Sequence, residues 1–414
     1  MPIYSRTNKT QKPIKKNNYG MVQKRRFGIV FICIVVIGLA FLGYRKTSTP
    51  QGQTNQKKQA NIQKKYIRIL ASGDTIAHDA LNAQARKTDG SYDYYQFMKP
   101  MQPFFDIADI KFCNQAVPGG GEKFGISGYP VFNSPLDVAR DLNKLGCNVV
   151  NTGTNHTFDR GQAVIDAELN YWDTLPRMLA VAGANRIQAE QDNIRYFTVR
   201  GVRFAFLSYS TYTNTPPTTP YGLNVYNDAK AESQVRTARL AADIVMVSMR
   251  WGTEYSSSIN DQQSQISQHL SDWGADIILG HGPHVLQPVK TLKGSDGRQT
   301  ICWYSLGNFL NAQIPIESLA NGLAIMDVDI ATKKLKAPEY VPIYMHYEWT
   351  ADEKTREDLL KRKNFSLVPL DSAASLLKKS QNNTTVETQT IRIQKTLNQF
   401  TTVPLISLSD LQKL

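Results

Sequence analysis

Two histidines in one stiff turn are the first candidates for chemistry. The stretch GHGPHVLQP (280–288) places His281 and His284 three residues apart, directly after an apolar run. Its glycines permit a sharp turn, and Pro283 stiffens the loop between the two imidazoles. Neutral imidazole is a common ligand of divalent transition metals, and protonated imidazole binds phosphate or carboxylate groups. We therefore predict a binding site here; the alternative is a strand end capped by hydrogen bonds from the histidines to the backbone.

A second cluster lies in NTGTNHTFDRG (151–161), where Asn155, His156 and Asp159 offer an amide oxygen, an imidazole and a carboxylate within five residues. Asp74, in SGDTIAHD (72–79), follows an apolar strand and a glycine. That position suits a metal ligand or an acid/base group, and equally the N-cap of a following helix. Both stretches are predicted to add polar groups to one site.

Three further stretches end in polar residues. RWGTEY (250–255) contains Arg250 and Glu254, which form either a salt bridge at the rim of a pocket or a pair of groups that recognise a ligand. Asn114 and Asn308 each follow another apolar run. We group these four as candidate substrate-binding residues.

The elements that must position these side chains are short apolar runs alternating with longer helical patterns. Examples are the strand-like runs YIRILASGD (66–74), CNVVN (147–151), ADIVMVSMR (242–250) and ADIIL (275–279). This alternation predicts an α/β domain with buried strands. The polar candidates fall where these runs end, and in open α/β sheets the carboxyl ends of the strands converge on one ligand-binding crevice. The separate stretches are thus expected to form one site.

The net charge of +13 is unevenly distributed. Residues 1–65 hold 14 Lys or Arg and no Asp or Glu, whereas the other 349 residues carry 34 basic and 35 acidic side chains. Charge therefore gives no support for a nucleic-acid partner of the main domain.

The basic arm surrounds an uncharged stretch, FGIVFICIVVIGLAFLGY (27–44), whose 18 residues nearly cross a bilayer core of roughly 30 Å. Residues 1–26 are predicted to be a basic cytoplasmic tail, 27–44 a transmembrane signal anchor and 45–65 a flexible linker. The main domain, 66–350, would then be extracellular, with 351–414 as a peripheral C-terminal extension. A cleaved signal peptide is the alternative, but its apolar region would be unusually long.

The four cysteines are scattered singly: Cys33 in the predicted span, and Cys113, Cys147 and Cys302 beside apolar residues. Three cysteines cannot all pair within one chain. They are read as core residues rather than as a disulfide framework or a zinc cluster.

The ordered set of GD (73–74), ADI-x-x-x-N (108–114), NTGTNHTFDRG, RWGTEY, GADIILGHGPHVLQP (274–288) and YSLGNF (304–309) resembles the CapA/PgsA-type poly-γ-glutamate capsule synthesis proteins. The resemblance covers about residues 67–309, and GHGPHVLQP with SLGNF (305–309) is its most specific part. It implies a calcineurin-like metallophosphoesterase fold, a four-layer α/β/β/α sandwich, here preceded by a single transmembrane helix.

The resemblance also implies roles. Asp74, Asn155, His281 and His284 would bind one or two divalent metal ions (Mn, Fe or Zn), and His156 would act as a general acid next to Asp159. Asn114, Arg250, Glu254 and Asn308 would contact the substrate. Two positions depart from the family pattern: Gln115 stands where a Glu is usual, and Arg250 where a His is usual. An amide is a weaker ligand than a carboxylate, and a guanidinium cannot bind a cation, so at least one metal position should be weakened.

The sequence therefore predicts a membrane-anchored protein that makes, exports or attaches an anionic capsule polymer such as poly-γ-glutamate, together with other membrane-bound capsule synthesis subunits. Metal-assisted hydrolysis or transfer is one mode of action. A non-catalytic polymer-binding or assembly subunit is the alternative, and a general metallophosphoesterase is a second alternative.

Overall fold

The structure, a computed structural model, describes residues 65–412. The predicted tail, transmembrane span and nearly all of the linker lie outside the described residues. Within residues 65–412, no helix has the length and apolar character needed to cross a bilayer.

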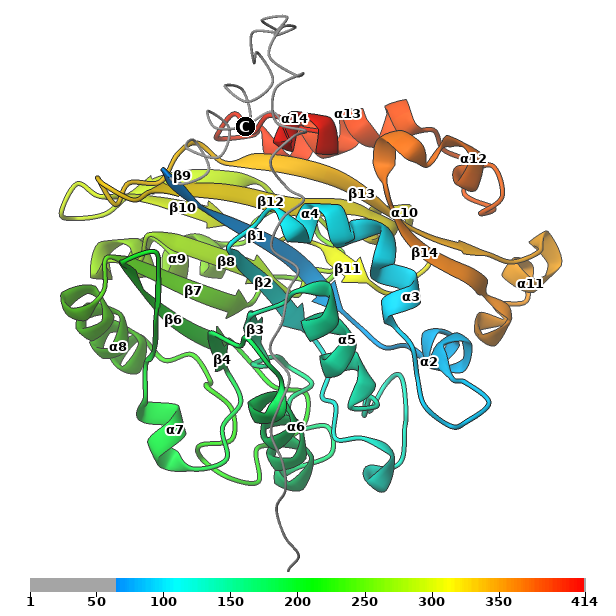
Figure 1. Cartoon of the computed structure of the whole chain (residues 1–414), viewed down its shortest axis with the longest axis horizontal. Coiled ribbons are helices and arrows are strands. Elements are labelled where there is room, and N and C mark those ends of the chain that lie inside the picture. Colours follow the sequence, from blue (N-terminus) through cyan, green and yellow to red (C-terminus); the bar gives the residue numbers. More distant parts are fainter. Residues whose placement is uncertain (1–64, 413–414) are drawn as a thin grey trace, which may run out of the picture. The chain divides into compact units, whose positions relative to one another are not determined.

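Two β-sheets form the centre of the domain (Figure 1). The first is eight-stranded, ordered β14-β13-β12-β1-β2-β3-β4, with β11 also paired to β1. Its strands are β1 (Tyr66–Thr75), β2 (Ile110–Gln115), β3 (Val149–Asn151), β4 (Ala180–Ala182), β11 (Asn308–Leu310), β12 (Ala320–Asp329), β13 (Glu339–Glu348) and β14 (Lys363–Pro369). Strands β1 to β4 are parallel, and β12 to β14 are antiparallel.

The second sheet is six-stranded, in the order β5-β6-β7-β8-β10-β9. Its strands are β5 (Arg195–Val199), β6 (Val202–Ser210), β7 (Ile244–Arg250), β8 (Ile277–His281), β9 (Val289–Lys293) and β10 (Gln299–Trp303). Strands β6, β7, β8 and β10 are parallel and almost wholly buried, which explains why they appear in the sequence as continuous apolar runs rather than as alternating patterns.

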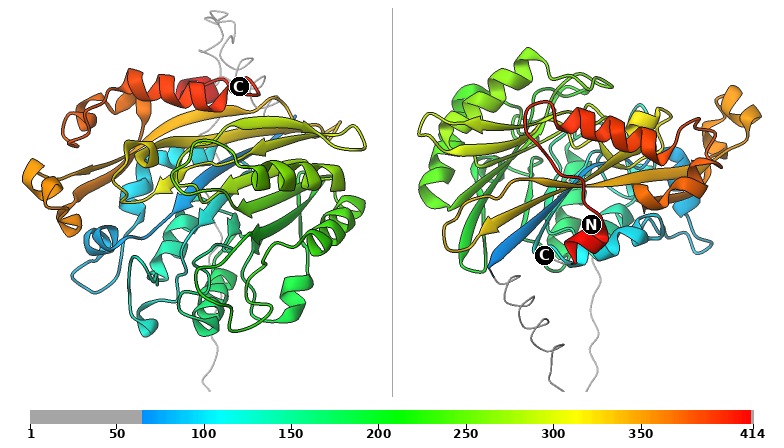
Figure 2. Two further views of the ribbon diagram at one scale, coloured as in Figure 1. Left: turned by 180° about the vertical axis from the view of Figure 1, so that it is seen from behind. Right: turned by 90° about the horizontal axis from the view of Figure 1, so that it is seen from above.

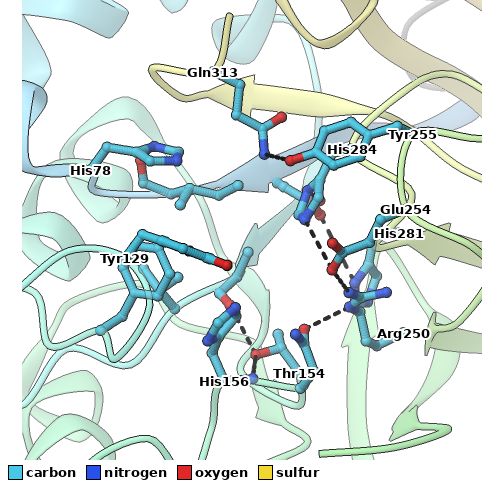
Figure 3. Close-up of a pocket in the computed structure, with 16 residues that line it drawn as sticks. His78, Tyr129, Thr154, His156, Arg250, Glu254, Tyr255, His281, His284 and Gln313 are labelled. Atoms are coloured by element: carbon cyan, nitrogen blue, oxygen red, sulfur yellow. Dashed lines mark hydrogen bonds and ion pairs between the residues drawn. The ribbon is translucent and has the colours of Figure 1, made fainter. Parts of the chain in front are cut away.

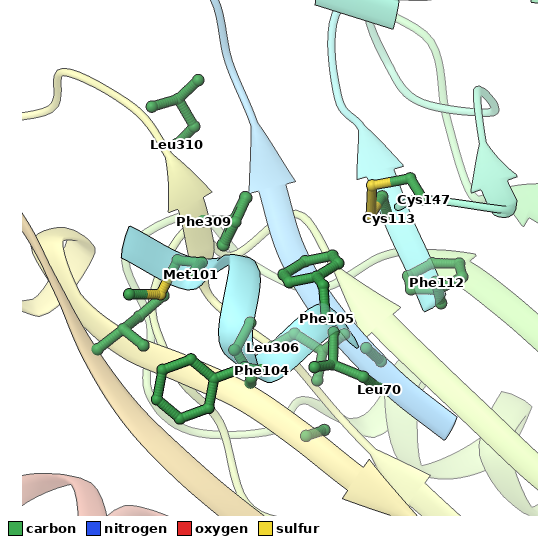
Figure 4. Packing of buried hydrophobic residues seen from close by; sticks show 14 of the residues in the cluster. Leu70, Met101, Phe104, Phe105, Phe112, Cys113, Cys147, Leu306, Phe309 and Leu310 are labelled. Atoms are coloured by element: carbon green, nitrogen blue, oxygen red, sulfur yellow. A yellow bond between two sulfur atoms is a disulfide. The ribbon is translucent and has the colours of Figure 1, made fainter. Parts of the chain in front are cut away.

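The sheets pack face to face through large side chains. Phe112 of β2 meets Phe206 of β6 with ring centroids 6.0 Å apart, and Trp303 of β10 stacks on Tyr340 of β13 at 5.8 Å. The outer face of the second sheet packs on α8 (Asp228–Ala241) and α9 (Asp261–Trp273). The first sheet packs on α4 (Gln102–Asp106), as Figure 4 shows, and on α5 (Asp137–Leu145). The α/β class is thus confirmed, with two facing sheets between helices.

Smaller helices complete the described chain. They are α2 (Asp79–Ala85), α3 (Tyr95–Met98), α6 (Gln162–Thr174), α7 (Gln188–Asp192), α10 (Ile316–Leu319), α11 (Ala351–Thr355), α12 (Ala374–Leu377), α13 (Val386–Leu397) and α14 (Leu408–Leu411).

A disulfide joins Cys113 to Cys147, so the interpretation of both as unpaired core cysteines was wrong (Figure 4). Cys113 lies on β2, and Cys147 immediately precedes the neighbouring parallel strand β3, which brings their Cα atoms to 5.8 Å. The sequence separation of 34 hid this proximity. Cys302 is the free cysteine within the described residues, and it is buried.

The residues expected to form a peripheral extension instead contribute to the core. Strand β14 pairs with β13 at the edge of the first sheet, and α13 lies against that sheet (Figure 2). Helix α13 contacts β12, where Arg392 donates a hydrogen bond to the Ala320 carbonyl. Ile393 and Leu397 of α13 are fully buried. The polar face of α13 had masked this in the sequence.

The buried face of α13 gives a direct test. Replacing Ile393 by Ala is expected to lower the free energy of unfolding by about 2–4 kcal/mol, because it removes buried methyl groups and leaves a cavity. Ile391, on the same helix but 58% exposed, is the matched control, and its replacement by Ala should cost less than about 1 kcal/mol. Chemical denaturation of both variants measures the difference; equal losses would contradict the packing of α13.

Candidate active site

The polar candidates meet at one edge of the two sheets. Asp74 and Asn114 lie at the ends of β1 and β2, Arg250 and His281 end β7 and β8, and Asn308 begins β11 beside Asp74. Asn155 and His156 follow β3 in a loop. A pocket with about 480 Å³ of empty space, including its mouth, opens here (Figure 3). Seven of the ten predicted residues line it: Asp74, Asn155, His156, Arg250, Glu254, His281 and His284.

Asp74 is the centre of the buried side of the pocket. Its Oδ1 accepts a hydrogen bond from Asn114 Nδ2 at 2.6 Å, and its Oδ2 lies 2.7 Å from His284 Nδ1. Burial raises the pKa of Asp74, but the hydrogen bond and charge of His284, with His281 and Arg250, outweigh it and the net pKa is lowered. Asp74 is therefore held as a carboxylate.

His281 presents an unused nitrogen to this carboxylate. Its Nε2 lies 2.9 Å from Ser248 Oγ and 3.1 Å from Asn151 Nδ2, whereas its Nδ1 has no hydrogen-bond partner among the described residues and lies 4.0 Å from Asp74 Oδ1. Burial is the main cause that lowers the pKa of His281 to about 3, so the ring is neutral. The amide nitrogen of Asn151 can only donate, so its hydrogen bond to Nε2 requires the ring hydrogen to lie on Nδ1. The tautomer with hydrogen on Nε2 donates to Ser248 Oγ instead and directs the Nδ1 lone pair at the pocket.

The guanidinium of Arg250 donates four hydrogen bonds to neighbouring groups. Nε donates to Asn155 Oδ1 (2.7 Å), Nη1 to the Trp251 carbonyl (3.2 Å), and Nη2 to the Tyr212 hydroxyl (2.7 Å) and Glu254 Oε1 (3.1 Å). Four of the five guanidinium N–H groups are thus engaged, and the side chain is 2% exposed. The salt bridge, one of the two alternatives for Arg250 and Glu254, is present, and the fifth N–H makes no hydrogen bond within residues 65–412.

His156 and Asp159 form a dyad at the other wall. His156 Nδ1 lies 2.7 Å from Asp159 Oδ2, which also accepts the Phe132 backbone N–H at 2.8 Å. The Phe132 ring meets the imidazole edge-on at 4.8 Å between centroids. The ring is therefore oriented by two contacts, and its Nε2, at the pocket wall, lies 3.4 Å from Asn214 Nδ2.

The three remaining predicted residues lie behind the pocket wall. Asn114 and Asn308 are almost fully buried, Asn308 Oδ1 lies 3.1 Å from His284 Nδ1, and Asp159 acts through His156. Sequence reasoning missed Asn151 and Ser248, which hold His281. Both are polar residues at or near the carboxyl ends of apolar strands, so the strand-end criterion applies to them as well.

The pocket mouth was also missed. His78, Tyr129, Phe132, Tyr255 and Gln313 form it, and the Tyr255 hydroxyl accepts a hydrogen bond from Gln313 Nε2 at 3.2 Å. Tyr129 is 78% exposed and Tyr255 54%. Only His78 carried a signal in the sequence, since it stands four residues after Asp74.

The donor types fit one cation but not two. Asp74, His281 and His284 are suitable ligands for a divalent transition metal, and the unpartnered Nδ1 of His281 is consistent with that use. Within residues 65–412, however, no three His, Cys, Asp or Glu side chains gather around a common metal position, and His284 is instead hydrogen-bonded to Asp74. At a second position, the predicted ligand oxygen of Asn155 is already bound by Arg250.

Gln115, the other departure from the family pattern, is turned away from the pocket. Its Nε2 donates to Glu168 Oε1 at 2.5 Å, and its Oε1 accepts from Trp172 Nε1 at 3.0 Å. Glu168, on α6, is 2% exposed, and burial raises its pKa to about 8 despite hydrogen bonds from Gly119 and Gln115. Gln115 therefore satisfies a buried acid instead of a metal.

The chain belongs to the bacterial capsule synthesis protein PGA_cap family, whose model matches residues 68–313 and so includes all ten predicted residues. Among curated relatives, it is 34% identical over 183 residues to the PGA biosynthesis protein CapA of Bacillus subtilis (strain 168), covering 42% of this chain and 44% of that protein. It is 30% identical over 217 residues to the capsule biosynthesis protein CapA of Bacillus anthracis, covering 46% and 49%. The matches span about half the length of each relative.

Solved structures with similar coordinates include a phosphatase from Mycoplasma pneumoniae, with 12% identity, 67% of this chain and 94% of that chain covered, and a TM-score of 0.43. A 5'-nucleotidase from Candida albicans SC5314 has 10% identity, coverage of 66% and 51%, and a TM-score of 0.38.

The close fit of Arg250 against Gly282 can be tested. A Cβ at Gly282 would lie 1.9 Å from Arg250 Nη1, and the residue has a φ of +109°. Gly282→Ala should therefore destabilise the fold by about 2–4 kcal/mol. Gly201→Ala is the control, because Gly201 has a φ of +78° and open space, and should cost about 1 kcal/mol. In an Arg250→Ala background the excess at Gly282 should shrink; an unchanged excess would contradict the contact.

Glu168 should make stability depend on pH. Its folded pKa of about 8 lies above the ordinary 4.5, so stability is fully present below pH 4.5 and declines as the pH rises toward 8. The decline approaches about 1.4 kcal/mol per pH unit. Glu168→Gln should remove it while keeping an acceptor for Gln115. Denaturation midpoints of both proteins between pH 5 and 9 measure the effect, and parallel profiles would refute it.

Proposed function

We propose that this chain acts in the synthesis, export or attachment of an anionic envelope polymer such as poly-γ-glutamate, from a single-pass membrane position with its main domain outside the cell. Membership of the PGA_cap family and the names of the two relatives support the polymer. The Cys113–Cys147 disulfide supports the location, because disulfides persist mainly in oxidising compartments.

The observation that carries the proposal is the meeting of Asp74, His281 and Arg250 in one pocket. Apart from histidines, the charged side chains that line it are Asp74, Glu254 and Arg250, with a formal sum of −1. An anionic ligand group is repelled by that balance, although one Arg250 N–H can bind it. A divalent cation of the Mn, Fe or Zn type would supply the missing positive charge and act as a Lewis acid toward a phosphoester or amide-type bond.

Different residues of the chain then have different roles in the reaction. Arg250 and His284 orient the anionic group, and the buried neighbours Asn114, Asn151 and Ser248 keep Asp74 and His281 in place. His156 protonates the leaving group through Nε2, while Asp159 holds the ring and stabilises its charged form.

A second candidate function is a non-catalytic polymer-binding or assembly subunit of a membrane complex. The hydrogen bond from Arg250 to Asn155 favours it, because this bond takes the ligand oxygen that a second metal ion would need. A general metallophosphoesterase ranks behind both, since nothing in the pocket selects simple phosphodiesters.

Metal content separates these functions. After loading the full chain with Mn²⁺ and removing free metal, we expect one equivalent, lost on Asp74→Asn. Substoichiometric metal with unchanged poly-γ-glutamate binding would favour the non-catalytic subunit. Turnover of a simple phosphodiester that is lost in Asp74→Ala, without any effect on the polymer, would favour the general phosphoesterase.

The catalytic form of the proposal is tested at His156. His156→Gln should slow cleavage or transfer of poly-γ-glutamate by about 10²–10⁴-fold, the usual contribution of a general acid, with metal content unchanged. His269→Gln is the matched control, because His269 lies on α9 away from the pocket lining. Equal rates for wild type and His156→Gln would remove His156 from the mechanism.

A further inference from the structure

A second concavity lies at the opposite ends of the strands. It encloses about 1650 Å³ of empty space, solvent at its mouth included, between the β9–β10 turn and the β12–β13 turn. Asp243 and Asp276, which immediately precede β7 and β8, line its floor. The candidate active site lies at the carboxyl ends of the same strands. A strand rises about 3.3 Å per residue, so roughly 20–30 Å separate the two sites.

The walls of this concavity are rich in cations. Lys333, Lys334 and Lys336 come from the β12–β13 turn, and Arg298 comes from the β9–β10 turn. We call these four residues and the space between them the basic groove.

The β12–β13 turn holds its lysines on a fixed backbone. Asp329 Oδ1 accepts hydrogen bonds from the backbone of Ala331 (3.0 Å) and Thr332 (2.9 Å) and from the Thr332 hydroxyl (3.1 Å). The Lys333 N–H donates to the Asp329 carbonyl, and the Asp329 N–H to the Lys334 carbonyl. The lysine side chains therefore project from an ordered base, and little backbone entropy is lost when a ligand binds.

The two acids on the floor do not neutralise these lysines. Asp276 Oδ2 accepts hydrogen bonds from Arg239 (2.6 Å) and from the Val245 N–H (2.7 Å). Asp243 Oδ2 accepts a hydrogen bond from the backbone N–H of Arg203 at 2.8 Å. Both carboxylates are thus already engaged by groups outside the turn.

The four cations of the basic groove differ in the ion pairs that they form. Arg298 lies 3.6 Å from Asp276 and 3.3 Å from Asp296, and Lys336 lies 4.0 Å from Asp327 and 3.3 Å above the Tyr66 ring. Lys333 and Lys334 form no ion pair with any residue between 65 and 412. Lys333 and Lys334 thus carry positive charges without an ion pair among the described residues, and Asp243 carries a negative charge without one. The four cations of the groove exceed its two floor acids by two charges.

We propose that the basic groove binds a stretch of anionic polymer, a polycarboxylate chain, at a distance from the pocket that handles the reacting group. This inference rests on the proposed function, which supplies the polymer. Repeated carboxylates can bridge Lys333, Lys334 and Arg298 in turn, which a single small anion cannot do. The described chain begins at Lys65, whose carbonyl accepts the Ile330 N–H beside the turn, so the predicted linker joins the domain at this end.

A concave groove fits a chain better than a bilayer. Peripheral membrane binding usually adds inserted apolar side chains to electrostatic attraction. None of the large exposed hydrophobic residues of the described chain lines the groove. The polymer is therefore the occupant that the surface favours.

The test uses the full chain in an uncharged detergent and long poly-γ-glutamate as the probe. Lys333→Glu/Lys334→Glu should weaken binding at least about tenfold at low salt, and should make the affinity less sensitive to salt. The matched control is Lys378→Glu/Lys379→Glu, two consecutive exposed lysines that follow α12 and do not line the groove, with the same change in net charge. The control should bind as wild type does, because the N-terminal basic arm contributes equally to all three proteins.

The outcomes are distinct. Equal binding by all three proteins contradicts the proposal that the basic groove binds the polymer. Equal weakening by both double variants contradicts it as well. Loss of binding to anionic phospholipid vesicles, with polymer binding intact, overturns it in favour of a membrane contact. Weaker polymer binding with an unchanged rate on a short γ-glutamyl oligomer supports it. The proposed function fails separately, if pocket variants such as Asp74→Asn leave capsule production unchanged.

Discussion

The buried guanidinium of Arg250 determines which loops meet at the pocket. Arg250 is 2% exposed at the end of β7, and a charge in such a position is tolerated only when its N–H groups find acceptors. Asn155, Trp251, Tyr212 and Glu254 supply them, from three separate loops. Because these acceptors must reach the guanidinium, the three loops come together at Arg250. The guanidinium also leaves no space for a side chain at Gly282.

The same requirement decides what the site can hold. A permanent internal cation stands where Asn155 would otherwise offer an oxygen to a metal ion. The remaining donors, Asp74, His281 and His284, lie on the other side of the pocket with their own supporting hydrogen bonds. The pocket is thus asymmetric: one half has a fixed positive charge, and the other half has the carboxylate and imidazoles that a mobile cation would need.

Much of this arrangement follows from the sequence because strand ends in an α/β sheet converge. Asp74, Asn114, Arg250, His281 and Asn308 all meet that criterion, and Asn151 and Ser248 meet it too. Features that depend on contacts between distant segments did not follow. The amide of Gln115 turns to Glu168, 53 residues away, and Cys113 meets Cys147 only because β2 and β3 are neighbours. Strand β14 is recognisable only beside β13, since its own pattern is weak.

The place of β1 in the first sheet has a consequence for how the domain is made. Strand β1 is the first described strand to leave the ribosome, yet one of its edges pairs with β12, some 250 residues later in the chain. At about 5–20 residues per second, that edge waits on the order of tens of seconds for its partner. The other edge waits much less, because β2 and the Cys113–Cys147 loop follow soon after. The early half of the sheet can thus assemble and be cross-linked while its open side still depends on the late strands, which makes the central strand the point where an incomplete chain is most open to wrong pairing.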